Sequence, residues 1–202
     1  QEMMSSLLER EQSLMQMNVT LETKVRTRTA ELEASNRSLE AIARQDPLTH
    51  SYNRLALDEA LLDEYRLAQE SNHPLAVIMV DADHFKRVND NYGHTVGDIV
   101  LQKMAKLLAV QVGVKGMVAR FGGEEFTVLL PNTSALEAQS VADTLREELE
   151  KEEMIDGLYV TASFGVAMYE IGDCHYEQVL KRADAALYKA KEQGRNRVVV
   201  SD

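Results

Sequence analysis

The first 45 residues of the chain contain neither glycine nor proline, the residues that most readily interrupt a helix. Apolar residues recur here at seven-residue spacing, in two sets separated by a four-residue step. The sets are Leu7, Leu14 and Leu21, then Val25, Leu32 and Leu39, with Met17 and Ile42 as partial partners. A heptad repeat turns one stripe of a helix toward a partner helix, and a four-residue step locally unwinds the supercoil. The pattern predicts a helix of roughly 65 Å and favours a parallel coiled-coil dimer over a solvated single helix.

The composition of the whole chain limits the kinds of partner that it can bind. Hydrophobic residues make up 45% and charged residues 27%, which is typical of a packed domain. The formal net charge is −11, with 22 Lys and Arg against 33 Asp and Glu. This balance argues against a nucleic-acid polymer, whose binding needs a basic face. A nucleoside triphosphate stays compatible, because magnesium supplies positive charge locally. A single cysteine, Cys174, excludes an intrachain disulfide and a cysteine-ligated zinc site.

The apolar runs are too short to span a bilayer, and no signal peptide is recognisable. We therefore expect a cytoplasmic location, which is compatible with membrane anchoring of a longer protein. Because the chain begins with Gln1 rather than Met, we expect it to be a segment of a larger protein with a sensory region upstream.

The pattern after residue 45 predicts an α/β fold. Pro47 is expected to end the first helix, because the residue before proline is disfavoured in helical conformation. Alternating helical and strand periodicity then covers 53–70, 75–80, 98–110, 117–121, 126–130, 134–152, 158–168, 176–193 and 197–200. Ser134 and Glu137 have capping-box spacing, and Gly194 is typical of a helix C-cap. Neighbouring strands in this order favour a sheet with hairpins over a doubly wound parallel sheet.

Two acidic turns follow predicted strands. Asp81-Ala82-Asp83 comes directly after the apolar run 75–80, and Glu124-Glu125 follows a glycine pair 43 residues beyond Asp81. Each turn alone is more often structural than catalytic. If the two strands are neighbours, however, the carboxylates meet, and hard oxygens are the ligands that Mg²⁺ prefers. Two such ions would clamp the oxygens of a phosphoryl or nucleotidyl transfer.

Residues suited to a nucleotide lie between and after these turns. Backbone N–H groups after the first strand, together with Lys86, suit phosphate. Asn89 and Asp98 have the chemistry to read a purine edge, since a carboxylate matches the N1–H and 2-amino group of guanine. Lys191 and Arg195 are four residues apart, so both reach one anion, although capping of a helix C-terminus by cations is the alternative.

These motifs, in this order, resemble the GGDEF-domain diguanylate cyclases over residues 46–202. The matching segments include Asp46-Pro47-Leu48-Thr49, Asp81-Ala82-Asp83-His84-Phe85-Lys86, Asn89-Asp90, Gly93-His94, Gly97-Asp98, Phe121-Gly122-Gly123-Glu124-Glu125-Phe126, Ser163-Phe164-Gly165 and Gly194-Arg195-Asn196. The resemblance implies a palm-like core related to adenylyl cyclases, with a five-stranded sheet flanked by helices. Residues 1–45 would form a dimerising signalling helix and residues 46–202 the cyclase domain. The implied reaction converts two GTP into cyclic di-GMP and two pyrophosphates.

The resemblance also implies roles for individual residues. A divalent metal, Mg²⁺ or alternatively Mn²⁺, would be held by Asp81, Ala82 through its carbonyl, Glu124 and Glu125. Glu124 would accept the 3′-hydroxyl proton, with deprotonation by water as the alternative, and Lys86 would stabilise transition-state charge. The substrate would be bound by Phe85, Lys86, Asn89, His94, Asp98, Lys191 and Arg195.

One domain of this family holds one GTP, so two domains must face each other. The helix 1–45 would raise the effective concentration of one domain beside the other. We expect regulation through the step between Leu21 and Val25; unchanged activity and regulation after a three-residue insertion there would refute this.

The sequence departs from the family in two places. The inhibitory Arg-x-x-Asp motif is replaced by Gly113 and Gly116, with Lys115 as the nearby cation, so no product inhibition is expected there. His50 stands where the family usually has glycine, either touching the nucleotide or simply exposed. Rival readings are a degenerate GTP- or partner-binding domain, a cyclase that also uses ATP, and a purely structural dimerisation module.

Overall fold

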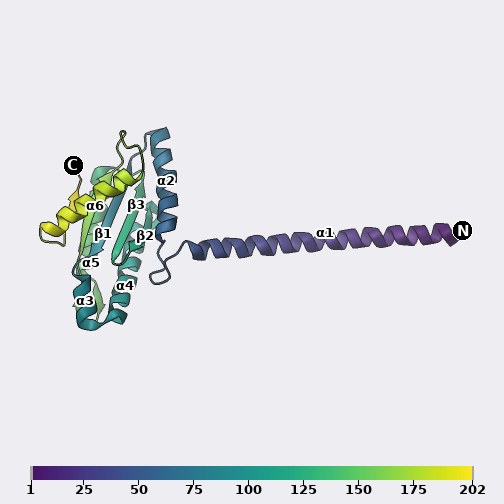
Figure 1. Cartoon of the computed structure of the whole chain (residues 1–202), viewed down its shortest axis with the longest axis horizontal. Coiled ribbons are helices and arrows are strands. Elements are labelled where there is room, and N and C mark those ends of the chain that lie inside the picture. The colour runs from purple at the N-terminus through teal and green to yellow at the C-terminus, as the bar shows by residue number, and fades with distance from the viewer. Residues whose placement is uncertain (1, 202) are drawn as a thin grey trace. The chain divides into compact units, whose positions relative to one another are not determined.

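The computed structural model describes residues 2–201, without the side chains of residues 2, 4–14, 19, 36–38 and 41. It divides into two units, Gln1–Ala43 and Arg44–Asp202. Figure 1 labels their helices and strands.

The first unit is one continuous helix, α1, which spans Glu2–Ala43. Two predicted heptad residues, Leu7 and Leu14, have side chains outside the described residues. The later apolar positions are exposed in the single chain: Met17, Leu21, Val25, Leu32, Leu39 and Ile42. The described part of α1 therefore presents apolar side chains that the chain itself does not cover. No described helix is long and apolar enough to cross a membrane.

The second unit is built on a five-stranded sheet in the order β2-β3-β1-β6-β7. Its strands are β1 (Leu75–Ala82), β2 (Met117–Gly122), β3 (Glu125–Pro131), β6 (Ala162–Met168) and β7 (Val198–Val200). The central strand β1 is antiparallel to both neighbours, β3 and β6, whereas β6 and β7 run parallel. The predicted α/β fold with an antiparallel-rich, five-stranded sheet is thus confirmed.

Helices cover both faces of this sheet (Figure 1). They are α2 (Arg54–Ser71), α3 (Phe85–Tyr92), α4 (His94–Val112), α5 (Ala135–Lys151) and α6 (Glu177–Glu192). Successive strand residues point to opposite faces, so Ile78 and Val80 pack in one core with α4 and α5. Val77 and Met79 pack in the other core with α2 and α6. Burial on both faces explains why β1 is an uninterrupted apolar run.

Three details differ from the predicted elements. The stretch before residue 98 forms α3 and the first turn of α4, separated by Gly93 at φ 83°. The strand expected over 158–168 is divided, because β5 (Leu158–Tyr159) pairs with β4 (Glu153–Ile155) in a separate two-stranded sheet. Asp156 and Gly157, both at positive φ, form that hairpin's turn. Finally, β1 runs two residues beyond position 80, which places Asp81 inside the sheet.

The two predicted caps are confirmed. Ser134 and Glu137 form a complete capping box at the start of α5. After α6, the N–H of Gly194 donates to the Lys191 carbonyl at 3.4 Å, and the N–H of Arg195 to the Ala190 carbonyl at 3.0 Å. These two bonds form a Schellman motif, which uses a glycine at positive φ.

Candidate nucleotide and metal site

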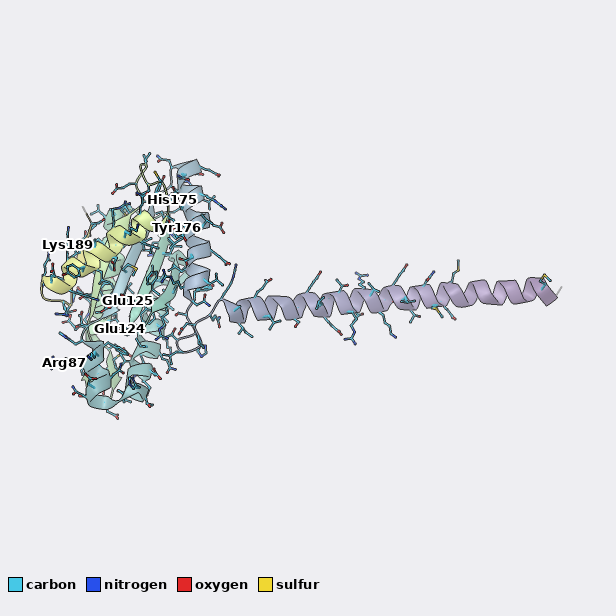
Figure 2. The ribbon with its side chains drawn as sticks, viewed as in Figure 1. Arg87, Glu124, Glu125, His175, Tyr176 and Lys189 are labelled. Atoms are coloured by element: carbon cyan, nitrogen blue, oxygen red, sulfur yellow. The ribbon has the colours of Figure 1, made fainter. Side chains whose placement is uncertain are left out.

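The two acidic turns lie side by side because β1 and β3 are neighbouring strands. Asp81 pairs across the ladder with Glu125, and the Ala82 N–H donates to the Glu124 carbonyl at 3.4 Å. Glu124 follows Gly123, whose φ of 53° allows the tight hairpin between β2 and β3. Figure 2 shows Glu124 and Glu125 close together at this end of the sheet. The tertiary structure therefore gathers the acidic residues at one edge.

Asp81 lies in an environment that disfavours its charge. Asp81 is only 7% exposed, and this burial raises the pKa of its carboxyl group to about 6. The Lys191 ammonium, 2.8 Å away, lowers the pKa, whereas the neighbouring Glu124 and Glu125 raise it. Burial outweighs the ion pair, so this edge favours additional positive charge.

The donor chemistry of this edge fits a divalent cation. Carboxylate oxygens are the ligands that Mg²⁺ and Mn²⁺ prefer. Asp81, Glu124 and Glu125 bring three carboxylates to this edge, and Asp81 is paired with Lys191. Among the described residues, however, no three His, Cys, Asp or Glu side chains form a ready-made metal cluster. Lys191 already occupies one oxygen of Asp81, and a cation bound there would compete with it.

Asn89 packs against Gly97, the residue before Asp98, because α3 and α4 fold back on each other at Gly93. A Cβ atom at Gly97 would lie 2.0 Å from Asn89 Oδ1, so a larger residue here would displace the Asn89 side chain. Asp98 follows on the exposed side of α4. The amide oxygen of Asn89 is buried and has no hydrogen-bond partner among the described residues. Such an orphaned oxygen is commonly satisfied by a ligand, an ion or water.

The predicted phosphate-binding groups come from two helix ends. Phe85 and Lys86 begin α3 after a short turn that follows β1, with Phe85 buried and Lys86 exposed. The first N–H groups of a helix lack intrahelical partners and attract anions. Lys191 lies in the last turn of α6 and reaches Asp81, and Arg195 lies in the turn that follows. His94 is exposed at the first position of α4.

Two contacts were missed by sequence reasoning. The guanidinium of Arg120 donates to the Gly123 carbonyl at 2.7 and 3.0 Å and lies 3.1 Å from the Asp46 carboxylate. The Asp83 carboxylate is buried among hydroxyl and backbone donors. The acidic turn Asp81-Ala82-Asp83 pointed to Asp83 as well as Asp81, but the sequence does not say which of the two aspartates faces the hairpin.

The two family departures line the same pocket. His50 is exposed at φ 57° and lines, with Gly113 and Gly116, a pocket of about 240 Å³. The left-handed backbone at residue 50 explains why glycine is common there in the family. A Cβ at Gly116 would lie 2.2 Å from the Leu129 carbonyl oxygen, so this backbone has no room for an aspartate.

An antiparallel-rich sheet with acidic strand ends and helices on both faces is the architecture of a palm-like cyclase domain. Residues 43–197 match the family model described as diguanylate cyclase, GGDEF domain. The chain belongs to the GGDEF family.

Relatives and solved structures agree with this membership. The chain is 44% identical over 135 residues to diguanylate cyclase A of Treponema denticola, and 37% identical over 166 residues to the probable diguanylate cyclase DgcT of Escherichia coli. These matches cover 65% and 80% of this chain but 36% of each relative, so the chain spans about a third of their length.

Two structures extend the similarity over α1. The coiled coil and GGDEF domain of DgcB from Caulobacter crescentus, in complex with c-di-GMP, has a TM-score of 0.78 and 33% identity, covering 90% of this chain and 99% of that one. SiaD from Pseudomonas aeruginosa, in complex with its activator SiaC, has a TM-score of 0.79 and 34% identity, covering 99% and 78%.

Proposed function

We propose that this chain is a diguanylate cyclase, which condenses two GTP into cyclic di-GMP with release of two pyrophosphates. The observation that carries the proposal is the acidic edge formed by Asp81, Glu124 and Glu125, with Lys191 bound to it. The diguanylate cyclases among its relatives, and the DgcB structure with c-di-GMP, support the same substrate class.

The acidic edge would hold Mg²⁺ or Mn²⁺ through Asp81, Glu124, Glu125 and the carbonyl of Ala82. When bound, the metal supplies positive charge at the reacting phosphate and at the 3′-hydroxyl. Glu124 accepts the 3′-hydroxyl proton, with water as the alternative acceptor. Lys86, exposed at the start of α3, stabilises the charge that develops on the phosphate.

The nucleotide would lie along α3 and the end of α6. Asn89 and Asp98 bind the guanine, which supplies a partner for the orphaned Asn89 oxygen, and His94 lies near it. The N–H groups of Phe85 and Lys86 bind phosphate oxygens. Two cations, Lys191 and Arg195, grip the rest of the triphosphate.

Catalysis requires two domains, each with one GTP, and we propose that α1 brings them together as a parallel coiled coil. The exposed apolar side chains of α1 lack partners within the single described chain, which supports pairing with a second copy. Pairing would raise the concentration of one domain near the other. The DgcB structure contains a coiled coil and covers 90% of this chain, which agrees with this arrangement.

The test is to incubate the full chain with GTP and Mg²⁺, with and without ATP, and to identify products by mass. We expect cyclic di-GMP as the product and no mixed dinucleotide, because the Asp98 carboxylate selects guanine. Glu124→Gln should reduce turnover by about 100-fold or more without loss of fold, whereas Glu152→Gln, an exposed residue after α5, should not. A folded, dimeric chain that binds GTP without turnover would favour the degenerate-domain reading instead.

A further inference from the structure

Asp83 is the acidic residue at this edge to which the proposed chemistry gives no role. It is only 5% exposed. Its carboxylate accepts hydrogen bonds from the hydroxyls of Thr161 and Ser163, both at 2.7 Å, and from the backbone N–H of Asn196 at 3.0 Å. These three donors are neutral, and they come from two segments far from Asp83 in the sequence. Asp83 therefore joins the end of β1 to the start of β6 and to the turn after α6.

The turn that Asp83 holds has an unusual backbone. Gly194, Arg195 and Asn196 have φ values of 114°, 61° and 45°. Glycine adopts such angles freely and asparagine tolerates them, but they are unfavourable for arginine. The Schellman hydrogen bond from the Arg195 N–H to the Ala190 carbonyl ties this turn to α6. The hydrogen bond from the Asn196 N–H to the Asp83 carboxylate ties the turn to the residue after β1.

The side chain of Asn196 makes a second stabilising contact. Its amide donates to Glu150 at 2.9 Å, and Glu150 is paired with Arg146 at 2.8 Å, both on α5. Arg195 thus lies between two anchored N–H groups, its own and that of the next residue. Its backbone cannot rotate without breaking one of the anchors, so its position is tied to β1 through Asp83.

We propose that Asp83 is a positioning residue that places Arg195 for the triphosphate. This inference rests on the proposed function, because it takes Arg195 as a phosphate ligand. Asp83 directly follows β1, which carries Asp81, so Asp83 sets where a phosphate-binding cation lies relative to the acidic edge. Loss of the Asp83 carboxylate releases the Arg195–Asn196 turn, and binding of the outer phosphates weakens.

The test compares Asp83→Ala with Asp83→Asn in the full chain. An asparagine keeps one acceptor for Thr161 and Asn196, and its amide donates to the Ser163 hydroxyl, which can also accept. We expect Asp83→Ala to weaken GTP binding by about tenfold and GMP binding by less than about twofold, because GMP lacks the outer phosphates. Asp83→Asn should bind both nucleotides nearly as wild type does. The exposed Asp63→Ala on α2 is the matched control.

A double-mutant cycle separates positioning from a general structural role. If Asp83 acts through Arg195, adding Asp83→Ala to Arg195→Ala should weaken GTP binding little further. The Asn196 amide should also exchange hydrogen faster in Asp83→Ala than in wild type. Equal losses for GTP and GMP, or fully additive losses with Arg195→Ala, would overturn the inference.

If Asp83→Ala fails to fold, Asp83→Glu serves in its place, because it keeps the charge and displaces the acceptor oxygens. The same selective loss for GTP is expected. Wild-type chain that neither binds nor converts GTP would contradict the proposed function itself. Wild-type chain that does both, beside an Asp83→Ala variant with unchanged GTP affinity, would contradict this inference alone.

Discussion

The ammonium of Lys191 lies 2.8 Å from the carboxylate of Asp81, so a proposed phosphate ligand is bound to a proposed metal ligand. The two residues come from α6 and from β1, which are far apart in the sequence. A divalent cation at Asp81 competes with Lys191 for the same oxygen. Its arrival would release Lys191 toward the triphosphate, so cation and nucleotide binding should be coupled.

Lys191→Met should therefore have opposite effects on metal and on nucleotide. We expect Mn²⁺ affinity without nucleotide to rise about fivefold, the scale of a partly exposed ion pair, as measured by electron paramagnetic resonance. GTP turnover should fall, because a phosphate ligand is lost. Lys181→Met, an exposed lysine of the same helix, is the control. Unchanged or weaker Mn²⁺ binding in Lys191→Met would show that Lys191 does not compete for Asp81.

The stability of the metal-free chain should carry a signature of Asp81. Burial raises its pKa to about 6, so the folded state binds this proton more tightly than the unfolded state does. The contribution of Asp81 to the free energy of unfolding therefore falls as pH rises from about 4 to about 6. Asp81→Asn should be more stable than wild type at pH 7, by about 1–3 kcal/mol, with little difference at pH 4.

Urea unfolding with EDTA at both pH values measures this difference. The comparison must be between variant and wild type, because the pKa values of Asp46 and Asp173 lie below the usual value. At Asp46 burial raises the pKa, but hydrogen bonds from Thr49 and Arg120 outweigh it; at Asp173 the hydrogen bond from Arg182 lowers the pKa. Those two carboxylates produce the opposite trend, with stability lost as pH falls. A variant that tracks wild type at every pH would contradict the assignment to Asp81.

Arg120→Lys should destabilise the hairpin between β2 and β3, which carries Gly123 and Glu124. Arg120 binds the Gly123 carbonyl through two N–H groups and Asp46 through a third, and one ammonium cannot serve both. Both side chains are largely buried, so we expect the free energy of unfolding to fall by about 2 kcal/mol. Urea unfolding measures it, with the exposed Arg66→Lys as control. An equally stable variant would mean that this tether is dispensable.

Gly116→Ala tests whether the backbone at position 116 has room for a side chain, which the aspartate of the inhibitory motif would need. Its Cβ would meet the Leu129 carbonyl oxygen at 2.2 Å, so we expect a loss of about 1–3 kcal/mol in stability. Gly172→Ala, whose Cβ meets nothing within 4 Å, should be nearly neutral in its effect on stability.

Added cyclic di-GMP should leave the GTP turnover of the wild-type chain unchanged, because the inhibitory motif is absent. Turnover that stalls at low product concentration would contradict this.

Leu32→Asp with Leu39→Asp should disrupt the proposed dimer. Both leucines are exposed on α1 in the single chain, and charge at a coiled-coil seam opposes pairing. Sedimentation should show monomers at concentrations where wild type is dimeric, and turnover per chain should fall. Ala30→Asp, which is off the heptad seam, is the control. Dimers that persist in the double variant would mean that α1 does not hold the two copies together.

Local features of the fold could be predicted from the sequence. The absence of glycine and proline predicted α1, and Ser134 with Glu137 predicted the cap of α5. Each of these depends on contacts within about one turn of helix, so a few neighbouring residues suffice. The β4–β5 hairpin was missed although Asp156-Gly157 is a typical turn pair. The strand pattern of residues 158–168 begins within β5, so β5 was assigned to the longer strand.

The order of motifs determined the family, but the partnerships within the site were decided by the tertiary structure. Sequence could name Asp81, Asp83 and Lys191 as chemically suitable, yet not that Lys191 binds Asp81 while Asp83 holds the Asn196 turn. Those pairings follow from the placement of β1 between β3 and β6 under α6. Such contacts close loops of many residues, and they form only when the whole sheet and its two cores assemble.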